Sequence, residues 1–184
     1  MRLAFLSIFS LWTSLNLMAS LAPSMSIPRD ASRKYLTDGI FDGGRAIRAN
    51  LEALRFSKHP KEGYERWVFD FSDASTRTLG SLAPQFQVRY IKAGKIAKPE
   101  GGYQTVEPAR IVITLKGISK NLLSRTQLEK IARKSNLVKE IVSYPPIEDG
   151  DIAIEIILKD SYPFYTHQPL KNEGRLVIDL SQNS

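Results

Sequence analysis

GRLVIDL, residues 174–180, and ERWVFDF, residues 65–71, are two copies of one seven-residue pattern, and ARIVITL, residues 109–115, is a third. Each copy has an arginine, then an apolar residue, a valine, another apolar residue, an Asp or Thr, and a final apolar residue. Apolar side chains at every second position are typical of a strand that buries one face. The copies therefore predict three strands that share one core.

The charged members of the pattern are predicted to lie at the surface. Asp70 and Asp179 have the opposite parity to the apolar residues beside them, so we expect both carboxylates to face solvent or a loop. Arg66, Arg110 and Arg175 precede the apolar runs. We expect their aliphatic stems to cover the apolar residues and their guanidinium groups to stay in water.

Further strands are predicted at residues 85–91, 138–144 and 151–158. In the first of these, Phe86, Val88 and Tyr90 alternate with polar residues. Residues 51–60 could form a first strand or a short helical turn, which Pro60 ends because proline lacks a backbone donor.

A short helix is predicted within SRTQLEKIARKSN, residues 124–136. Ser124 and Gln127 have the spacing of a capping box, and an apolar stripe follows at helical spacing. The outer face of this helix would carry Arg125, Lys130, Arg133 and Lys134. Strands separated by turns, with one helix across them, predict a mainly β fold, a two-sheet β-sandwich with one short helix.

The start of the chain has the features of a secretory signal peptide, which we place at residues 1–24. Arg2 precedes an apolar stretch and then small residues, and this stretch is too short and too polar for a membrane anchor. We expect residues 25–49 to form a flexible leader and residues 50–182 to form the folded domain. The chain contains no cysteine, which favours a bacterial periplasmic or secreted location over a disulfide-stapled ectodomain.

The charge of the chain is uneven. The net charge is +7, and residues 116–139 carry seven Lys or Arg against one acid, a local charge of +6. Residues 140–184 carry three bases against eight acids, which gives −5. This asymmetry suggests a basic face that meets anionic material, although a solvated helix face explains it equally well. Nucleic acid is not an expected partner, because the basic clusters lack interleaved aromatic residues.

Four segments in order resemble the AMIN-like family, relatives of the amidase N-terminal domain of bacterial envelope proteins: LRFSKHPKEGYERWVFDF, QFQVRYI, ARIVITLKG and DGDIAIEIILKDSYPFYTHQPLKNEGRLVIDL. The resemblance covers about residues 50–182. It implies a β-sandwich, export by a signal peptide, and a non-catalytic role in binding cell wall or positioning an envelope partner. The chain departs from the family in lacking a lipid-anchor cysteine and in having residues 154–156, Ile-Glu-Ile, where relatives often carry a tryptophan.

The sequence predicts no enzyme, metal site or cofactor. Its two histidines, His59 in a turn and His167 in a proline-flanked loop, lack the HExxH pattern of a zinc enzyme. The acidic group Glu148, Asp149 and Asp151 suggests a solvated turn and does not match an EF-hand loop.

The preferred hypothesis is a binding module for peptidoglycan or a related anionic envelope polymer. Exposed aromatic rings beside polar groups are typical of carbohydrate sites, and the candidates are Arg89, Tyr90, Lys92, Tyr103, Tyr162 and Tyr165. Core packing remains the alternative for each tyrosine. The alternative function is a protein-protein interaction or assembly factor that docks another envelope protein on an edge strand or on the helix face.

Overall fold

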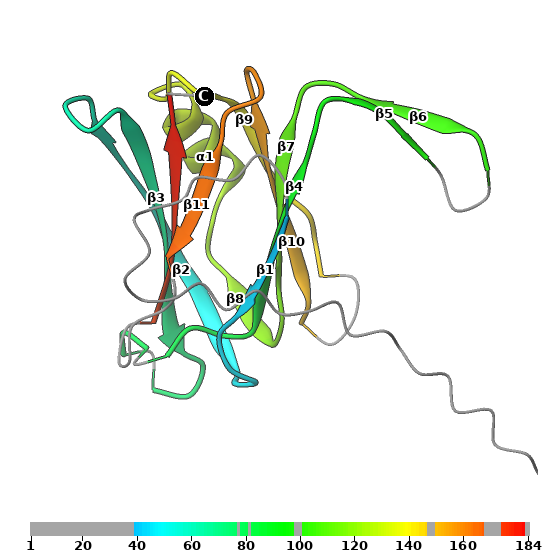
Figure 1. Ribbon diagram of the computed structural model, residues 1–184. Coiled ribbons are helices and arrows are strands. Elements are labelled where there is room, and N and C mark those ends of the chain that lie inside the picture. Colours follow the sequence, from blue (N-terminus) through cyan, green and yellow to red (C-terminus); the bar gives the residue numbers. More distant parts are fainter. Residues whose placement is uncertain are drawn as a thin grey trace, which may run out of the picture.

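Two five-stranded β-sheets pack face to face in the computed structural model of the protein, which describes residues 39–76, 78–80, 82–97, 101–146, 150–167 and 174–182 (Figure 1). This mainly β architecture with one short helix is the fold class that the sequence predicts. The expected signal peptide and residues 25–38 of the expected leader lie outside the described residues.

One sheet, here called the β4 sheet, has the strand order β1-β4-β7-β10-β9. Its strands are β1 (Ile40–Gly43), β4 (Phe86–Ile91), β7 (Arg110–Leu115), β10 (Ile152–Leu158) and β9 (Val138–Ser143). All of its neighbouring strands are antiparallel.

The other sheet, here called the β3 sheet, has the order β11-β12-β3-β2-β8. Its strands are β11 (Phe164–His167), β12 (Arg175–Ser181), β3 (Tyr64–Asp73), β2 (Ala49–His59) and β8 (Ile118–Asn121). The β2–β8 pair is parallel and the other pairs are antiparallel.

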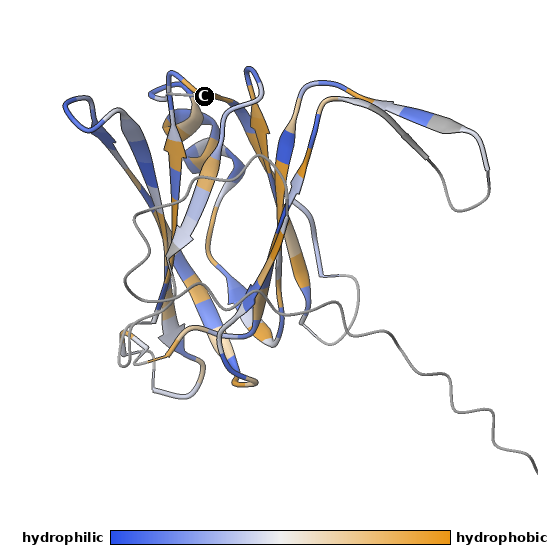
Figure 2. Ribbon diagram, in the orientation of Figure 1, coloured by the Kyte–Doolittle hydropathy of each residue, from blue (hydrophilic) through white to orange (hydrophobic). Residues whose placement is uncertain are grey.

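The core lies between the inner faces of the two sheets. Trp67, Phe69 and Phe71 of β3 are almost completely buried, and so are the inward isoleucines of β7 and β10. Buried and half-buried positions alternate along β7 and β10, as a period of two requires, and hydrophobic residues recur along the strands of both sheets (Figure 2). Each fully buried large apolar side chain stabilises the fold by roughly 1.5–3 kcal/mol relative to its exposed state.

Helix α1 (Arg125–Ala132) follows β8, the edge strand of one sheet, and precedes β9, the edge strand of the other. The predicted capping box is present, since Ser124 Oγ accepts from the Gln127 backbone N–H and Gln127 accepts from the Ser124 N–H. The buried side chains of the helix are Leu128 and Ala132. The helix packs against β9 on this side of the sandwich.

Several short strands were not predicted from the sequence. β1 lies within the expected leader, so the sandwich begins before residue 49. β8 and β11 have only four residues each. His167 therefore ends a strand and does not lie in a loop. Residues 51–60, for which helix or strand remained open, belong to β2 up to His59.

A two-stranded hairpin, β5 (Gly94–Ala97) and β6 (Tyr103–Val106), was also not predicted. It continues from β4 and leads into β7, and it projects away from the sandwich (Figure 1). A period of two is hard to recognise over only four residues, which explains why these strands escape sequence reading.

Gly174, the first residue of GRLVIDL, holds the start of β12 against the segment that follows β3. Its N–H donates to Gly80 O at 2.8 Å, and its carbonyl accepts from Phe71 N, also at 2.8 Å. A Cβ at this position would lie 2.3 Å from Gly80 O. The close backbone approach therefore requires glycine here.

Candidate functional site

The repeated pattern places its charged residues opposite one another on the outer face of the β3 sheet. Strands β3 and β12 are antiparallel neighbours in which Val68 faces Val177. An arginine two residues before each valine and an aspartate two residues after it lie on the same face of a strand. Because the strands run in opposite directions, Arg66 faces Asp179 and Arg175 faces Asp70.

The first of these pairs is bidentate. Arg66 Nε donates to Asp179 Oδ1 at 2.8 Å and Nη2 donates to Oδ2 at 2.9 Å. The Asp179 side chain is fully buried, whereas 26% of the Arg66 side chain is exposed. The arginine thus covers the carboxylate, and two parallel hydrogen bonds fix the plane of its guanidinium.

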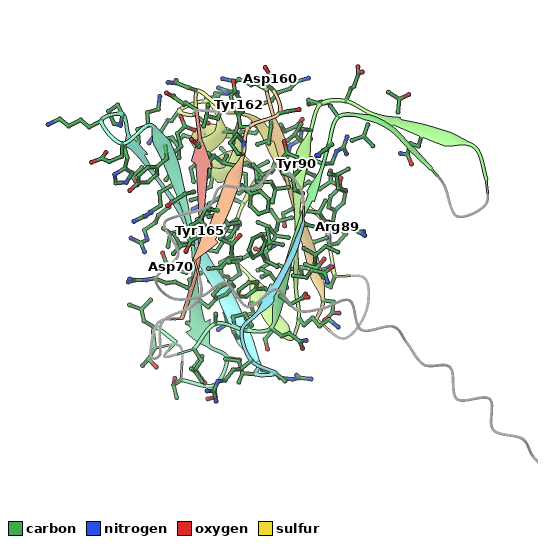
Figure 3. The ribbon with its side chains drawn as sticks, in the orientation of Figure 1. Asp70, Arg89, Tyr90, Asp160, Tyr162 and Tyr165 are labelled. Carbon is green, nitrogen blue, oxygen red and sulfur yellow. The ribbon has the colours of Figure 1, made fainter. Side chains whose placement is uncertain are left out.

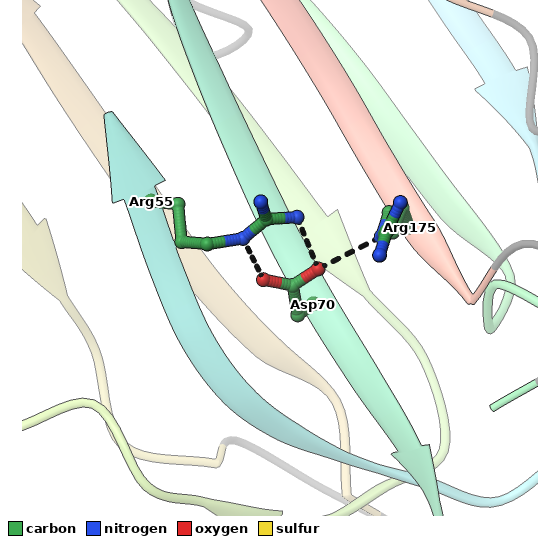
Figure 4. Close-up of polar contacts among 3 residues, drawn as sticks. All are labelled: Arg55, Asp70 and Arg175. Carbon is green, nitrogen blue, oxygen red and sulfur yellow. Dashed lines mark hydrogen bonds and ion pairs between the residues drawn. The ribbon is translucent and has the colours of Figure 1, made fainter. Parts of the chain in front are cut away.

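The second aspartate holds two arginines (Figure 4). Asp70 accepts from both Nε and Nη2 of Arg55, with 2.8 Å between Nη2 and Oδ1, and from Arg175 Nε at 3.1 Å. The hydrogen bond to Asp70 raises the pKa of Arg55, so this guanidinium is charged throughout the physiological range. The Asp70 side chain is 9% exposed, while 55% of Arg55 and 41% of Arg175 are exposed.

We call this surface the arginine face and define it by Arg55, Arg66, Arg175, Asp70 and Asp179. Its three cations and two anions leave a surplus of one positive charge. The sequence-based expectation for both aspartates was wrong in part: they point outward but are buried, because arginines cover them. The arginine heads are likewise paired with carboxylates instead of standing free in water.

Aromatic rings adjoin the arginine face. The rings of Tyr64 and His59 stack with centroids 4.5 Å apart, and the Arg66 guanidinium lies 5.3 Å from the Tyr64 ring centroid. Tyr165 of β11 is opposite Asp179 and therefore also lies on the outer face. His59, the last residue of β2, has its Nε2 3.0 Å from Ser57 Oγ.

The third copy of the pattern lies in the other sheet and has Thr114 where the first two have aspartate. Its neighbours β4 and β10 do not carry the pattern, and Arg110 pairs with Glu155 of β10 at 3.2 Å. The outward positions Val112 and Ile157 are half-buried, whereas Arg89 and Glu140, opposite them on the neighbouring strands, are exposed. This face thus mixes apolar and charged positions.

The four candidate ligand residues that Figure 3 labels, Arg89, Tyr90, Tyr162 and Tyr165, do not lie together on one surface. Arg89 is exposed on the outer face of β4, and Lys92 is exposed just beyond that strand. Tyr162 is half-buried and packs against the core, whereas Tyr165 lies on the β3 sheet. Tyr103 belongs to β6, and its side chain is outside the described structure.

Tyr90 lies in the core, and core packing was the alternative interpretation for each tyrosine. It is 6% exposed and stacks on Phe164 of the opposite sheet, with ring centroids 5.5 Å apart. Burial raises the pKa of its hydroxyl. Its parity with Val88 explains this placement, since both point from β4 toward the core. Tyr90 is therefore not part of a ligand-binding surface in this structure.

The predicted basic face of the helix is exposed. Arg125 pairs with Glu129 at 2.9 Å, and Lys130, Arg133 and Lys134 are all exposed. Two more lysines approach the segment after the helix: Lys58 Nζ donates to Asn136 Oδ1 at 2.8 Å, and Lys159 Nζ donates to Ser135 O at 2.9 Å. Cations near a helix C-terminus interact favourably with its dipole, which gives this cluster a structural role in the fold.

The part of the chain that the structure describes contains no cluster of three or more histidine, aspartate or glutamate side chains suited to a metal ion. Of the acidic group 148–151, Glu148 and Asp149 lie outside the described residues, as does the His167 side chain. No helix within the described ranges has the length and hydrophobicity needed to span a bilayer.

Comparison of the chain with models of known protein families gives no match, and comparison with curated proteins gives none either. The candidate site therefore stands on its own geometry. Sequence reasoning did not select Arg55, Arg66 or Arg175 as site residues. The available signal was the R-x-x-x-D spacing shared by two copies of the pattern, which becomes reciprocal pairing once those copies are antiparallel neighbours.

Proposed function

We propose that the protein is an exported, non-catalytic binding module of the bacterial envelope, and that its arginine face holds peptidoglycan or a related anionic wall polymer. The observation that carries this proposal is the placement of three arginines beside two buried aspartates on the outer face of a sheet. The resemblance of the sequence to AMIN-like proteins and the signal-like N-terminus point to the same location and role.

The buried aspartates orient the guanidinium groups before a ligand arrives. Arg55 contacts Asp70 through Nε and Nη2, and Arg175 contacts it through Nε. The other guanidinium nitrogens of these two residues make no hydrogen bond within the described part of the chain and can donate to a carboxylate of the polymer. A preorganised arginine loses less conformational freedom on binding than a free side chain does.

The rings beside the arginines would add contacts with sugars. Tyr165 and His59 are each half-buried on this face, so each ring presents part of its surface. Aromatic faces pack against the apolar sides of sugar rings, while neighbouring polar groups fix the orientation of the ligand. A polymer that carries both sugars and carboxylates, such as peptidoglycan, fits this combination.

Cosedimentation of the purified protein with insoluble sacculi across a salt series tests the proposal. We expect retention at low ionic strength and a progressive loss as salt screens the exposed charges. The double variant Arg55→Gln/Arg175→Gln should bind at least about tenfold more weakly, because two charge-assisted contacts are removed. The matched control is Arg110→Gln, which changes the arginine of the third copy on the opposite sheet and should stay within about twofold of the wild type.

Two results would contradict the proposal. One is the absence of retention on sacculi at low salt. The other is a double variant that is retained as well as the Arg110→Gln control, which would mean that binding depends on overall charge or on another surface. The second candidate function, interaction with another protein, is favoured by a groove along an edge strand, which is a separate surface.

A further inference from the structure

A groove of about 540 Å³ runs beside β9, the edge strand of the β4 sheet. One wall is the strand itself with its continuation, residues 140–146. The other wall comes from α1 and the segment before it, with Asn121, Leu123, Arg125, Leu128 and Glu129. The strand is thus bordered by an open channel of the size of a peptide site.

The backbone of β9 offers hydrogen-bonding groups to this groove. Tyr144 N donates to Ala153 O of β10 at 2.8 Å. Since the N–H and C=O groups of successive strand residues point to alternate sides, Val142 also faces β10, and Ile141 and Ser143 face the groove. Neither residue has a backbone hydrogen-bond partner on that side within the described part of the chain. An open edge of this kind is a template for one more strand.

The groove has a defined floor and a defined end. Leu128 and Ile141 are buried and Leu123 is half-buried, which provides an apolar floor for alternate side chains of an added strand. Pro145 and Pro146 follow the strand and interrupt regular pairing, because proline lacks the N–H that a ladder requires. The usable edge therefore covers residues 140–144.

The position of α1 excludes a second copy of β9 as the occupant. Paired strands lie about 4.8 Å apart, whereas packed helices need about 8–10 Å between their axes. Since α1 borders the open edge of β9, a symmetric β9–β9 pair would bring two copies of α1 closer than they can pack. An extended segment without a helix beside it has no such conflict.

The charge of the groove restricts the occupant further. Its charged side chains are Arg125, Glu129 and Glu140, and Arg125 pairs with Glu129 at 2.9 Å. Glu140 has no ion pair among the described residues, so the groove carries one negative charge in a protein whose net charge is +7. A lysine or arginine in the added strand would be complementary to it.

We propose that β9 binds an extended segment of a partner protein, with apolar residues at alternate positions and at least one basic residue, as a sixth strand of the β4 sheet. Main-chain hydrogen bonds to Ile141 and Ser143 would supply affinity, and the floor and Glu140 would select the sequence. This interaction is independent of the arginine face, which lies on the other sheet.

Selection of nine-residue peptides from a random phage-displayed library tests the proposal. Peptides enriched on the purified protein are synthesised, and their affinities are measured by calorimetry. We expect alternating apolar residues with a lysine or arginine among the enriched sequences. Amide exchange measured by NMR should slow at least tenfold for Ile141 and Ser143 when peptide is added.

A pair of proline variants separates strand addition from other modes of binding. Ser143→Pro removes an N–H that faces the groove and costs no ladder bond between β9 and β10, so the sheet should persist. It also removes the Ser143 hydroxyl, which accepts from Asn121 Nδ2 at 2.9 Å, and Ser143→Ala removes that hydroxyl alone. We expect peptide affinity to fall at least tenfold for the proline variant only. Ile40→Pro is the matched control on the other edge strand, β1. Tyr90 N donates to Gly39 O, so the backbone N–H of Ile40, the next residue, points away from β4. Replacing Ile40 with proline should therefore leave peptide affinity within twofold.

N-methylated peptides provide a test that does not depend on the folding of a variant. In an extended peptide, alternate amides face β9, so methylation of one alternate set should abolish binding and methylation of the other should not. The proposal is overturned if no peptide is enriched, if both methylated sets bind equally, or if Ser143→Pro binds as tightly as Ile40→Pro.

Discussion

The outer faces of the two sheets contain the same seven-residue pattern and differ in its sixth residue and in the strands beside each copy. In β3 and β12 that residue is aspartate, and the two strands form reciprocal pairs with arginines. In β7 it is Thr114, and the neighbouring strands supply a single ion pair to Arg110 among the described residues. The difference shows that the pattern specifies a strand, whereas the sixth residue and the neighbouring strand specify the character of the surface.

The largest expected effect comes from removing the buried acid of the arginine face. Asp179→Ala removes the fully buried carboxylate that accepts two hydrogen bonds from Arg66, and breaking such a pair costs about 3 kcal/mol. Thr114→Ala, the equivalent change in the third copy, should cost less than about 1 kcal/mol. The free energy of unfolding in urea measures both, and equal losses would abolish the distinction between the two faces.

Asp70 should couple to its arginines more weakly than Asp179 does. Both Arg55 and Arg175 are about half exposed, so solvent screens their interaction with the carboxylate. A double-mutant cycle of Asp70→Asn and Arg55→Gln should give a coupling free energy of about 1 kcal/mol. A coupling well above that for Asp179 and Arg66 would reverse the expected order.

The ion pair on the β4 sheet should be the weakest of the three. Arg110 and Glu155 are 26% and 18% exposed and meet through one contact at 3.2 Å. A cycle of Arg110→Gln and Glu155→Gln should give about 0.5 kcal/mol. If this value matched that of the bidentate pair, geometry and burial would not explain the difference between the faces.

The smallest effect is a titration on the β4 sheet. Burial raises the pKa of Tyr144, and the charge of Glu155 and a hydrogen bond to it raise it further. The hydroxyl therefore stays protonated above pH 10.0, and any stability linked to that proton is present below pH 10.0 and declines as pH rises through the folded-state pKa. Glu155→Gln should lower the Tyr144 pKa, as measured by NMR, whereas Asp70→Asn should leave it unchanged.

The sequence was sufficient for the long strands and the helix because their patterns extend over enough residues. Residues 65–71 and 152–158 alternate for three full repeats, and Ser124 with Gln127 marked the helix start. β1, β8 and β11 have four residues each, too few to establish a period. β1 and β8 are held by pairing with strands remote in sequence, whereas β11 pairs with the next strand, β12.

The candidate site was less predictable because it depends on which strands become neighbours. Nothing local to Asp70 indicates that Arg175, 105 residues away, will cover it. The parity of Phe86, Val88 and Tyr90 already indicated that the Tyr90 side chain faces the core. The choice of Tyr90 as a ligand residue did not use this information. Residue type alone was a weaker guide than strand parity.

The pairing of β3 with β12 also determines when the chain can fold. β3 is complete by residue 73, but its neighbour begins at residue 175, so more than a hundred residues must be synthesised before the two strands can meet. Contacts so distant in sequence slow folding, because a long loop must close before they form. A chain leaving the ribosome therefore cannot complete the β3 sheet until nearly all of its residues have been synthesised.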